Sequence, residues 1–224
     1  MTICIIPARG GSKRIKNKNI KKINNVPMLG HVIKTAVKSK LFSEIVVSTD
    51  SKKIKKIAIS YGAKVPFLRN KKLSNDYATT REVLIDCVKK IGSINSEFHF
   101  CLYPTAILIN QNDLIRAYKK IKKYKYDHLV AISKFNSSPL RALKIIYKNK
   151  IKFKYLKYKN FRTQRLPEEF FDSGSFYIWR TKKLLKKNLS WPSKTTYYQL
   201  NPHNTVDINT PEDLKLAKIL FNNY

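Results

Sequence analysis

The chain has 224 residues, 43% of them hydrophobic, and carries a formal net charge of +32. This length supports one sizeable core, no run approaches the roughly 20 apolar residues of a membrane span, and the N-terminus lacks the pattern of a cleaved leader. We therefore expect a single domain over residues 1–224 in the cytoplasm, with no membrane partner.

The positive charge could indicate a nucleic-acid partner, because cations release condensed counterions from a phosphate backbone. Only nine of the 46 basic residues are arginine, however, and the lysines are spread along the whole chain. Most fall where exposed helix faces are expected, which favours solvated surface over a nucleic-acid footprint. A basic α/β protein that binds nucleic acid stays open as an alternative from another functional class.

The cysteines and histidines indicate neither disulfides nor a zinc site. Cys4, Cys87 and Cys101 are odd in number and scattered, and two of them lie in apolar runs. This pattern is typical of buried, reduced thiols. The four histidines lack the spacing of metal ligands.

Strand-like and helix-like segments alternate through the first part of the chain. The expected strands are 3–6, 45–48, 65–68, 98–103 and 129–132, and the expected helices are 28–39, 52–61, 79–91 and 113–123. Strands that alternate with amphipathic helices of ten to fifteen residues form βαβ units. The sequence therefore predicts a doubly wound α/β fold with a mainly parallel sheet.

The pattern changes at Arg141, where apolar residues begin to recur at every second position around a turn at Lys148 to Lys150. This predicts an antiparallel hairpin. A lone two-stranded ribbon is marginal in water and would expose its apolar side chains. We expect residues 138–170 to form an insertion that a second copy covers in a homodimer; the alternative is that the hairpin folds back onto its own sheet.

The C-terminal part returns to the α/β pattern. We expect a strand at 174–179, a helix from Lys182, an irregular segment at 191–202 and a final helix that runs through Leu220. Thr210 is a good N-cap for that helix, and Pro211 suits its first helical position.

The first loop carries the strongest functional signal. The stretch I-C-I-I-P-A-R-G-G-S-K-R-I-K-N-K-N joins a buried strand to glycines and cations. Ligands collect at the carboxyl ends of such strands, and Gly10 with Gly11 let the backbone approach a phosphate. The motif is neither a Walker loop nor a dinucleotide fingerprint. The alternative is a basic surface turn. The surrounding charge comes from Arg9, Lys13, Arg14, Lys16 and Lys18.

Two acidic residues follow expected strands. Asp207 precedes the final helix, and Asp50 follows V-V-S-T. Either could hold a hard divalent cation; Asp50 could instead cap the helix over 51–61, and Asp207 could be a turn residue. A polar loop between a strand and a helix could read a base and ribose, although its Ser and Thr residues also suit helix capping. It contains Arg69, Ser74, Asp76, Thr79 and Thr80.

These motifs together resemble the cytidylyltransferases that make CMP-activated nonulosonic acids. The resemblance rests on the first loop, V-V-S-T-D, Y-G-A-K-V-P-F-L-R with L-S-N-D, R-T-Q-R-L-P-E-E-F, G-S-F-Y-I-W and V-D-I-N-T-P-E-D-L, and it covers nearly the whole chain. It implies a Rossmann-like nucleotide-diphospho-sugar transferase fold and a homodimer. It also implies transfer of CMP from CTP to the anomeric hydroxyl of a nonulosonic acid, with release of pyrophosphate and with Mg²⁺ as cofactor.

The resemblance also implies roles for individual residues. The loop after the fourth strand, from Tyr103 to Ala106, would border nucleotide and sugar, and Arg69 and Ser74 would face the cytosine. Arg9, Lys13 and Asp207 would be catalytic, and Asp207 would hold the metal. The triphosphate and ribose would be bound by Ala8, Arg9, Gly10, Gly11, Ser12, Lys13, Lys18 and Asn19. The sugar acid would be bound by Tyr103, Thr105, Gln164, Asp172, Ser173 and Gly174.

Three positions depart from the family pattern. Asn209 replaces the second aspartate of the final D-I-D motif and would weaken a metal site because a neutral amide lacks the carboxylate charge. Arg165 replaces an acidic residue, and P-T-A-I-L replaces the usual A-P-F ending. The expected sugar is pseudaminic acid. The alternatives are sialic acid, legionaminic acid or an eight-carbon keto-deoxy acid, or a homologue that has lost activity.

Overall fold

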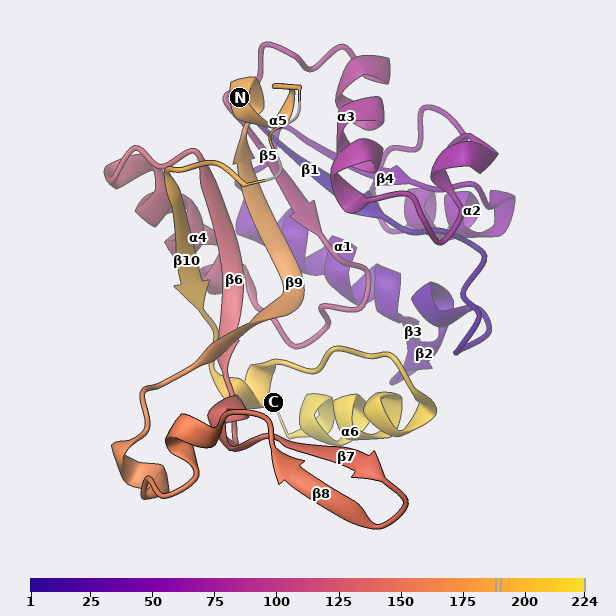
Figure 1. Cartoon of the computed structure of the whole chain (residues 1–224). Coiled ribbons are helices and arrows are strands. Elements are labelled where there is room, and N and C mark those ends of the chain that lie inside the picture. Colours follow the sequence, from indigo (N-terminus) through magenta and orange to yellow (C-terminus); the bar gives the residue numbers. More distant parts are fainter. Residues whose placement is uncertain (188, 190, 224) are drawn as a thin grey trace.

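The protein is described by a computed structural model that covers residues 1–187, 189 and 191–223. A six-stranded sheet in the order β10-β6-β9-β5-β1-β4 forms its centre (Figure 1). β9 is antiparallel to both neighbours, and the remaining pairs are parallel. The predicted α/β fold with a mainly parallel sheet is confirmed. The strands are β1 (Thr2–Pro7), β4 (Glu44–Ser48), β5 (Phe98–Leu102), β6 (His128–Lys134), β9 (Phe170–Arg180) and β10 (Thr195–Gln199).

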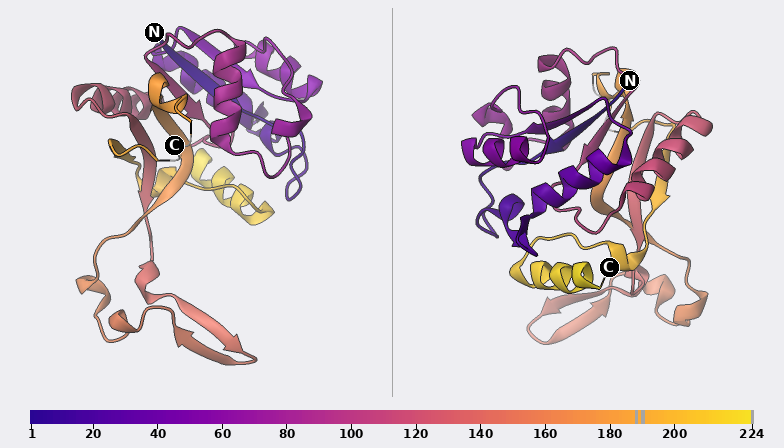
Figure 2. Two further views of the ribbon diagram at one scale, coloured as in Figure 1. Left: turned by 45° about the horizontal axis from the view of Figure 1, so that its top comes forward. Right: turned by 180° about the vertical axis from the view of Figure 1, so that it is seen from behind.

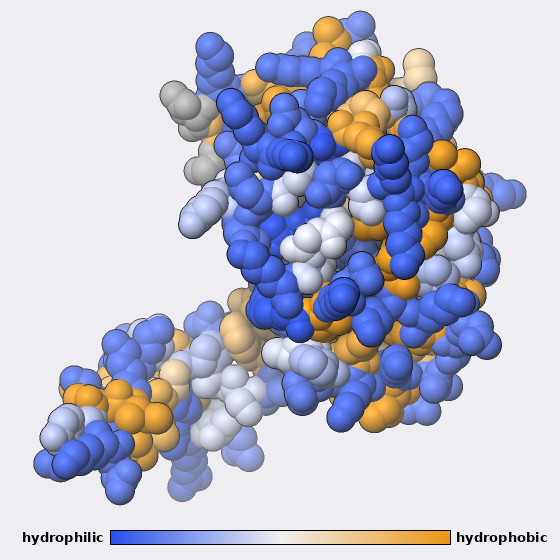
Figure 3. Space-filling view, turned by 90° about the vertical axis from the view of Figure 1, so that its right-hand side faces the viewer, coloured by the Kyte–Doolittle hydropathy of each residue, from blue (hydrophilic) through white to orange (hydrophobic). Residues whose placement is uncertain are grey.

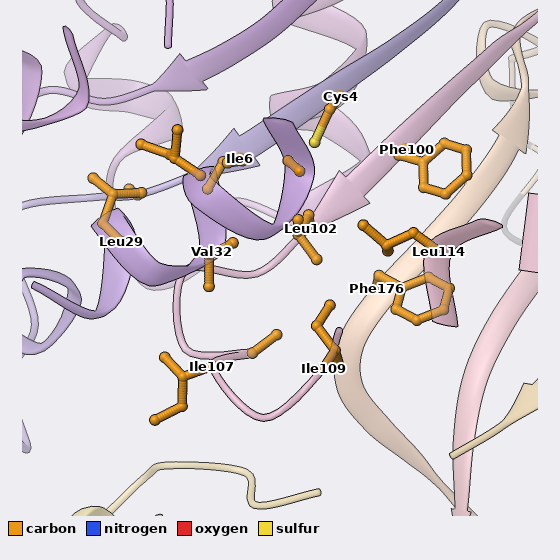
Figure 4. Close-up of a cluster of buried hydrophobic side chains, with 14 of the residues drawn as sticks. Cys4, Ile6, Leu29, Val32, Phe100, Leu102, Ile107, Ile109, Leu114 and Phe176 are labelled. Atoms are coloured by element: carbon orange, nitrogen blue, oxygen red, sulfur yellow. The ribbon is translucent and has the colours of Figure 1, made fainter. Parts of the chain in front are cut away.

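Helices cover the two faces of the sheet unequally. Residues of α1, α2, α4 and α6 pack into a large core on one face, part of which Figure 4 shows around Ile6, Phe100 and Phe176. α3 and α5 pack into a smaller core on the other face, where β6 and β9 have no long helix in front of them (Figure 1). The helices are α1 (Met28–Ser39), α2 (Lys52–Ser60), α3 (Thr80–Lys90), α4 (Gln111–Lys123), α5 (Thr181–Leu184) and α6 (Pro211–Asn222).

Capping explains where three of the long helices begin. Reciprocal capping boxes, in which two backbone N–H groups find side-chain acceptors, start α3 at Thr79, α4 at Asn110 and α6 at Thr210. The N-cap predicted at Thr210 is confirmed, and Pro211 occupies the first helical position. The remaining local elements are two small strand pairs and six 3₁₀ turns. They are β2 (Lys22–Ile23) with β3 (Val26–Pro27), β7 (Leu143–Tyr147) with β8 (Lys150–Phe153), and Lys18–Ile20, Lys71–Leu73, Pro139–Arg141, Leu156–Tyr158, Thr163–Arg165 and Pro202–Asn204.

Two predicted segments are wrong. Residues 65–68 do not form a strand, since Pro66 has no N–H to donate to a ladder. Isolated bridges join the flanking Lys64 to Val46 of β4, and Leu68 to Thr49 just after it. Residues 191–202 were expected to be irregular, but they contain β10. Its core, T-T-Y-Y, is β-branched and aromatic, which is the composition of a strand.

Residues 135–170 form an arm that extends away from the sheet (Figure 2). The hairpin of β7 and β8 lies in this arm, with every residue of β7 exposed. The alternative, in which the hairpin folds back onto its own sheet, is therefore wrong. The antiparallel hairpin itself is confirmed, and Lys148 takes a left-handed conformation at its turn.

The three cysteines lie in the core as free thiols. Burial raises the pKa of Cys87 to about 12 and raises the pKa of Cys4 and Cys101 as well, so all three stay protonated and unreactive. In the described part of the chain, no helix combines the length and apolar character needed to cross a membrane.

Candidate active site

The first loop follows β1 at the carboxyl edge of the sheet, and two hydrogen bonds from its backbone hold it there. The Ala8 N–H donates to the Ser48 carbonyl at the end of β4. The Gly10 N–H donates to the Asp50 carboxylate at 2.7 Å. Asp50 does not cap α2, because the Ser51 side chain has that role. Asp50 thus fixes the first loop in place. The Gly10 N–H, which we expected to face a phosphate, is already hydrogen-bonded to Asp50.

A cavity of about 260 Å³ opens above this loop. We call it the nucleotide cavity. Its walls come from the loops after β1 and β5, the segment before α3, and the segment before α6. The predicted site residues that line it are Arg9, Ser12, Lys13, Lys18, Asn19, Arg69, Tyr103, Thr105 and Asn209. Sequence positions from 9 to 209 are therefore brought together at one sheet edge, as expected for the fold.

Four predicted nucleotide residues do not line this cavity. Ala8 is fully buried beneath the loop. The side chain of Ser74 donates to the carbonyl of Asn70 within its own turn. Gly10 and Gly11 also lie outside the lining, and Gly10 packs against Ser51 so closely that an added Cβ would come within 3.1 Å of that side chain. A side chain at position 10 would therefore crowd Ser51 beside Asp50.

The cations of the first loop face an acidic residue across the cavity. One Asp76 oxygen lies 2.8 Å from the Arg9 guanidinium, and the other lies 2.6 Å from the Lys13 ammonium. Arg9 also donates to the carbonyl of Asn75 at 2.9 Å. Hydrogen bonds from Lys13 and then Arg9 lower the pKa of Asp76. From the sequence, Asp76 was expected in a loop that reads the base. In the structure it forms ion pairs with Arg9 and Lys13 of the first loop.

Two further cations are partly desolvated. Burial lowers the pKa of Lys18, with Arg14 and Arg9 lowering it further and Asp207 opposing them; its ammonium donates to the Ile208 carbonyl at 2.7 Å. Burial also lowers the pKa of Arg69, whose Nε and Nη2 atoms are buried without a partner among the described residues. Unpaired buried donors are costly, so Arg69 is a strong candidate to bond a ligand.

Asn209 lines the nucleotide cavity, whereas the predicted metal ligand Asp207 lies beside Asn209, outside the lining. The amide nitrogen of Asn209 donates to Asp207 at 2.5 Å, and its oxygen accepts from Arg14 at 2.7 Å. The side-chain oxygen of Asn209 thus already accepts from a cation, which disfavours it as a metal ligand. Mg²⁺ needs only one or two carboxylates when phosphates and waters complete its shell, so Asp207 alone fits it. The described residues contain no cluster of three potential ligands.

The predicted sugar residues do not converge on one place. Gly174 has a left-handed φ of 60° that brings the backbone against Asp207, 3.8 Å from where its Cβ would lie. The buried Ser173 hydroxyl donates to the Ala131 carbonyl, and it lines no cavity found at the site. Gln164 lies in the exposed turn Thr163–Arg165, within the arm that extends away from the sheet (Figure 2).

Asp172 leads to a second cavity, of about 240 Å³, that sequence reasoning missed. We call it the aromatic cavity. It lies between the start of α3 and the open face of β6 and β9. Thr80 and Tyr103, which are hydrogen-bonded to each other at 2.5 Å, line both cavities, so the two are neighbours. The other aromatic residues that line it are His128, Tyr177, Trp179 and Trp191.

The chain resembles known proteins over its whole length. Residues 3–216 match the family model described as cytidylyltransferase. The chain is 36% identical over 221 residues to the pseudaminic acid cytidylyltransferase of Campylobacter jejuni, covering 98% of this chain and 95% of the relative. It is 31% identical over 222 residues to the CMP-N,N'-diacetyllegionaminic acid synthase of Legionella pneumophila, covering 97% and 95%.

Solved structures agree on the fold. CMP:2-keto-3-deoxy-manno-octonic acid synthetase, solved in complex with CTP, superposes with a TM-score of 0.75 at 16% identity, over 99% of this chain and 98% of that one. A 4-diphosphocytidyl-2C-methyl-D-erythritol synthase from Anaerococcus prevotii superposes with a TM-score of 0.67 at 11% identity, over 99% and 96%.

Proposed function

The chain belongs to the cytidylyltransferase family, and from that premise we propose that it transfers CMP from CTP to the anomeric hydroxyl of pseudaminic acid and releases pyrophosphate. The observation that carries the nucleotide part is the nucleotide cavity itself. It gathers Arg9, Lys13 and Lys18 at the carboxyl edge of a parallel sheet, where α/β proteins bind ligands. The full-length identity to pseudaminic acid cytidylyltransferases supports the choice of sugar.

The cations of the first loop account for the triphosphate end of CTP. Arg9 and Lys13 already share one carboxylate, Asp76, so their charges converge on a point that an anion can occupy. During transfer, negative charge builds up on the leaving pyrophosphate, and fixed cations stabilise it without reorganising. Arg9 and Lys13 are therefore assigned to the β- and γ-phosphates. Positioning and charge stabilisation carry most of such a transfer.

Arg69 is assigned to the cytosine end. Arg69 is 5% exposed and lines the nucleotide cavity. Its backbone N–H is anchored to the Thr49 carbonyl at 2.7 Å, which fixes the residue beside β4. The unpaired Nε and Nη2 atoms match the acceptors that the carbonyl oxygen and ring nitrogen of cytosine present.

Asp207 would hold Mg²⁺ together with phosphate oxygens of CTP. When bound, the metal would supply Lewis-acid charge at the phosphates and lower the pKa of the attacking hydroxyl. Beside Asp207, the neutral side-chain oxygen of Asn209 accepts a hydrogen bond from the cationic Arg14. Arg14 therefore places a fixed positive charge next to the metal position, where a second carboxylate is absent.

The sugar acid is assigned to the space between Tyr103, Thr105 and Asp172. Its carboxylate would face the cations of the nucleotide cavity, because Asp172 repels it from the aromatic cavity. This assignment keeps the anomeric hydroxyl near the α-phosphate, at the boundary that Thr80 and Tyr103 share.

The arm supports a homodimer. Leu143, Ile145, Ile151 and Phe153 form one face of the hairpin, because they pair across the two strands, and Ile145 is 80% exposed. Apolar side chains on the protruding lobe are visible in Figure 3. A second copy would cover this face, since a lone ribbon is marginal in water. Gln164, on the same arm, would then meet the sugar acid only in the partner's site.

The test is product analysis with a panel of nucleotides. Purified protein is incubated with pseudaminic acid, Mg²⁺ and either CTP, UTP, ATP or GTP, and the products are identified by mass spectrometry. The proposal predicts a CMP-sugar from CTP and no product from the purine nucleotides. Equal use of all four nucleotides would contradict it, and tight binding to duplex DNA in moderate salt without turnover would favour the nucleic-acid alternative.

A further inference from the structure

A buried histidine, His128, lines the aromatic cavity, and no interaction within the described residues explains why a polar ring is buried there. His128 is 2% exposed, and neither ring nitrogen has a hydrogen-bond partner among the described residues. It lies at the start of β6, on the face of the sheet that α3 only partly covers. A phenylalanine at this position would avoid burying two polar atoms.

A second buried histidine shows the usual arrangement. His99 on β5 is fully buried, and its two nitrogens bond to the Ser93 and Thr181 hydroxyls, each at 2.8 Å. It therefore satisfies the rule that buried polar groups are paired. His128 breaks this rule and also lines a cavity, which points to a partner that the free protein lacks.

The protonation state of His128 limits what that partner can be. Burial lowers its pKa to about 3, so the ring is neutral near pH 7, with one nitrogen as donor and the other as acceptor. A secondary amide likewise offers one N–H donor and one carbonyl acceptor. An acylamino substituent can therefore bond one of the two ring nitrogens, through its carbonyl oxygen to the N–H or through its N–H to the acceptor.

The walls of the cavity suit the acyl part of such a substituent. Trp179 stacks on His128 with ring centroids 3.8 Å apart, and Trp191 meets the ring edge-on at 5.2 Å. Aromatic faces of this kind pack well against a methyl group. Trp191 is 60% exposed, so it can swing away without opening the core and give access to the imidazole.

The charges around the cavity fix which end of the substrate enters. Asp172 lines it, accepting bonds from Tyr177 at 2.6 Å and from the Gly174 N–H at 3.0 Å. Arg81, the cation in the lining, donates from its Nη2 atom to the carbonyls of Leu184 and Lys186, and its buried Nε has no partner among the described residues. The charges of Arg81 and Asp172 offset each other, so the lining offers no net positive charge to a carboxylate and favours the uncharged end of a sugar acid.

We infer that His128 is a specificity-determining residue, which hydrogen-bonds an acylamino group of the sugar acid inside the aromatic cavity while Trp191 moves aside. This inference rests on the proposed function. It adds a residue that selects acylamino sugars over those with hydroxyl groups only. Acylamino groups appear in the names of several relatives, including N-acylneuraminate cytidylyltransferase of Streptococcus agalactiae.

The chain provides its own reporter for this inference. Its two tryptophans are Trp179 and Trp191, and both line the aromatic cavity. Pseudaminic acid is titrated into protein saturated with CTP in the absence of divalent metal, and intrinsic tryptophan fluorescence is recorded. The expected result is a saturable change in the wild type and a dissociation constant about tenfold higher in His128→Phe, the effect of about one lost hydrogen bond.

Further measurements separate recognition from structure. His128→Phe should bind CTP normally and melt no earlier than the wild type, whereas a structural role predicts a lower melting temperature. His128→Asn, which keeps a donor and an acceptor, should recover part of the affinity. His203→Phe, the same change at an exposed position outside the cavities, should behave as the wild type. 2-Keto-3-deoxy-octonic acid, which has no acylamino group, should bind wild type and His128→Phe equally.

The outcomes distinguish this inference from the proposed function. Turnover of pseudaminic acid with equal sugar affinities in wild type and His128→Phe, or without a tryptophan signal, overturns the role of His128 and leaves the proposed function intact. Absence of both turnover and binding with every sugar acid overturns the proposed function and this inference together.

Discussion

One oxygen of Asp76 lies 2.8 Å from the Arg9 guanidinium, and the other lies 2.6 Å from Lys13. The two cations assigned to the triphosphate are therefore held together by a protein carboxylate when no nucleotide is bound. CTP has to displace that carboxylate, or share the cations with it. Asp76 thus prepares the loop geometry and also competes with the substrate.

Replacing Asp76 by asparagine tests the balance between these two effects. Asp76→Asn removes the competing charge and keeps the shape, so we expect the dissociation constant for CTP to fall about threefold; the pair is exposed to solvent, which limits the gain. The measurement is isothermal titration with CTP. Asp86→Asn, which breaks an ordinary i,i+4 pair with Lys90 on α3, should have no effect. Weaker CTP binding in Asp76→Asn would mean that positioning of Arg9 outweighs competition.

Asn209 should limit the affinity for Mg²⁺. Asn209→Asp removes the N–H that donates to Asp207 and adds a second carboxylate, which a hard cation prefers. We expect the Mg²⁺ concentration for half-maximal rate to fall at least severalfold, and Asp207→Asn to raise it. Asn112→Asp, the same change at an exposed position of α4, is the matched control and should leave the Mg²⁺ requirement unchanged. An unchanged Mg²⁺ requirement in both Asn209→Asp and Asp207→Asn would place the metal elsewhere.

The arm should hold two copies together through its apolar face. Ile145 and Ile151 lie opposite each other on that face, and Lys144 and Lys152 lie opposite each other on the other face. We expect the wild type to have twice the mass of one chain in light scattering and the Ile145→Lys, Ile151→Lys double variant to be monomeric. Lys144→Ala with Lys152→Ala should stay dimeric. A monomeric wild type at micromolar concentration would contradict the dimer.

Acid should destabilise the protein partly through its two buried histidines. Burial lowers the pKa of His99 to about 4 and of His128 to about 3, from an ordinary value of 6.5. Below pH 6.5 the unfolded chain therefore binds protons that the folded one does not, and stability falls as pH decreases, by up to about 1.4 kcal/mol per pH unit for each ring. The free energy of unfolding should fall less steeply between pH 6.5 and 4.5 in His128→Phe. Equal slopes would show that His128 is protonated in the folded state.

The sequence predicted the elements whose signals are local. The limits of α1 at Met28 and Ser39 follow from its apolar periodicity, and α6 begins where Thr210 and Pro211 indicate. The carboxyl-edge location of the first loop followed from one buried strand and the βαβ pattern. The failures at 65–68 and at β10 came from an overlooked proline and an overlooked β-branched run.

The site was predictable only where chain order determines it. Arg9, Lys13 and Lys18 follow β1 directly, so their place at the sheet edge required no tertiary information. Arg9 bonds to Asn75, next to Asp76, and Arg14 bonds to Asn209; these partners are 66 and 195 residues apart, and no local pattern encodes such pairs. His128 had no signal in the sequence, because its importance is the lack of partners in the folded protein.

The most direct test of the account is pyrophosphate release from purified protein with CTP and Mg²⁺, compared between pseudaminic acid, N-acetylneuraminic acid and no sugar. The account predicts rapid release with pseudaminic acid, slower release with N-acetylneuraminic acid and none without sugar, and a loss of several orders of magnitude in Arg9→Ala. Release that does not depend on the sugar acid, or a near-normal rate in Arg9→Ala, would contradict it.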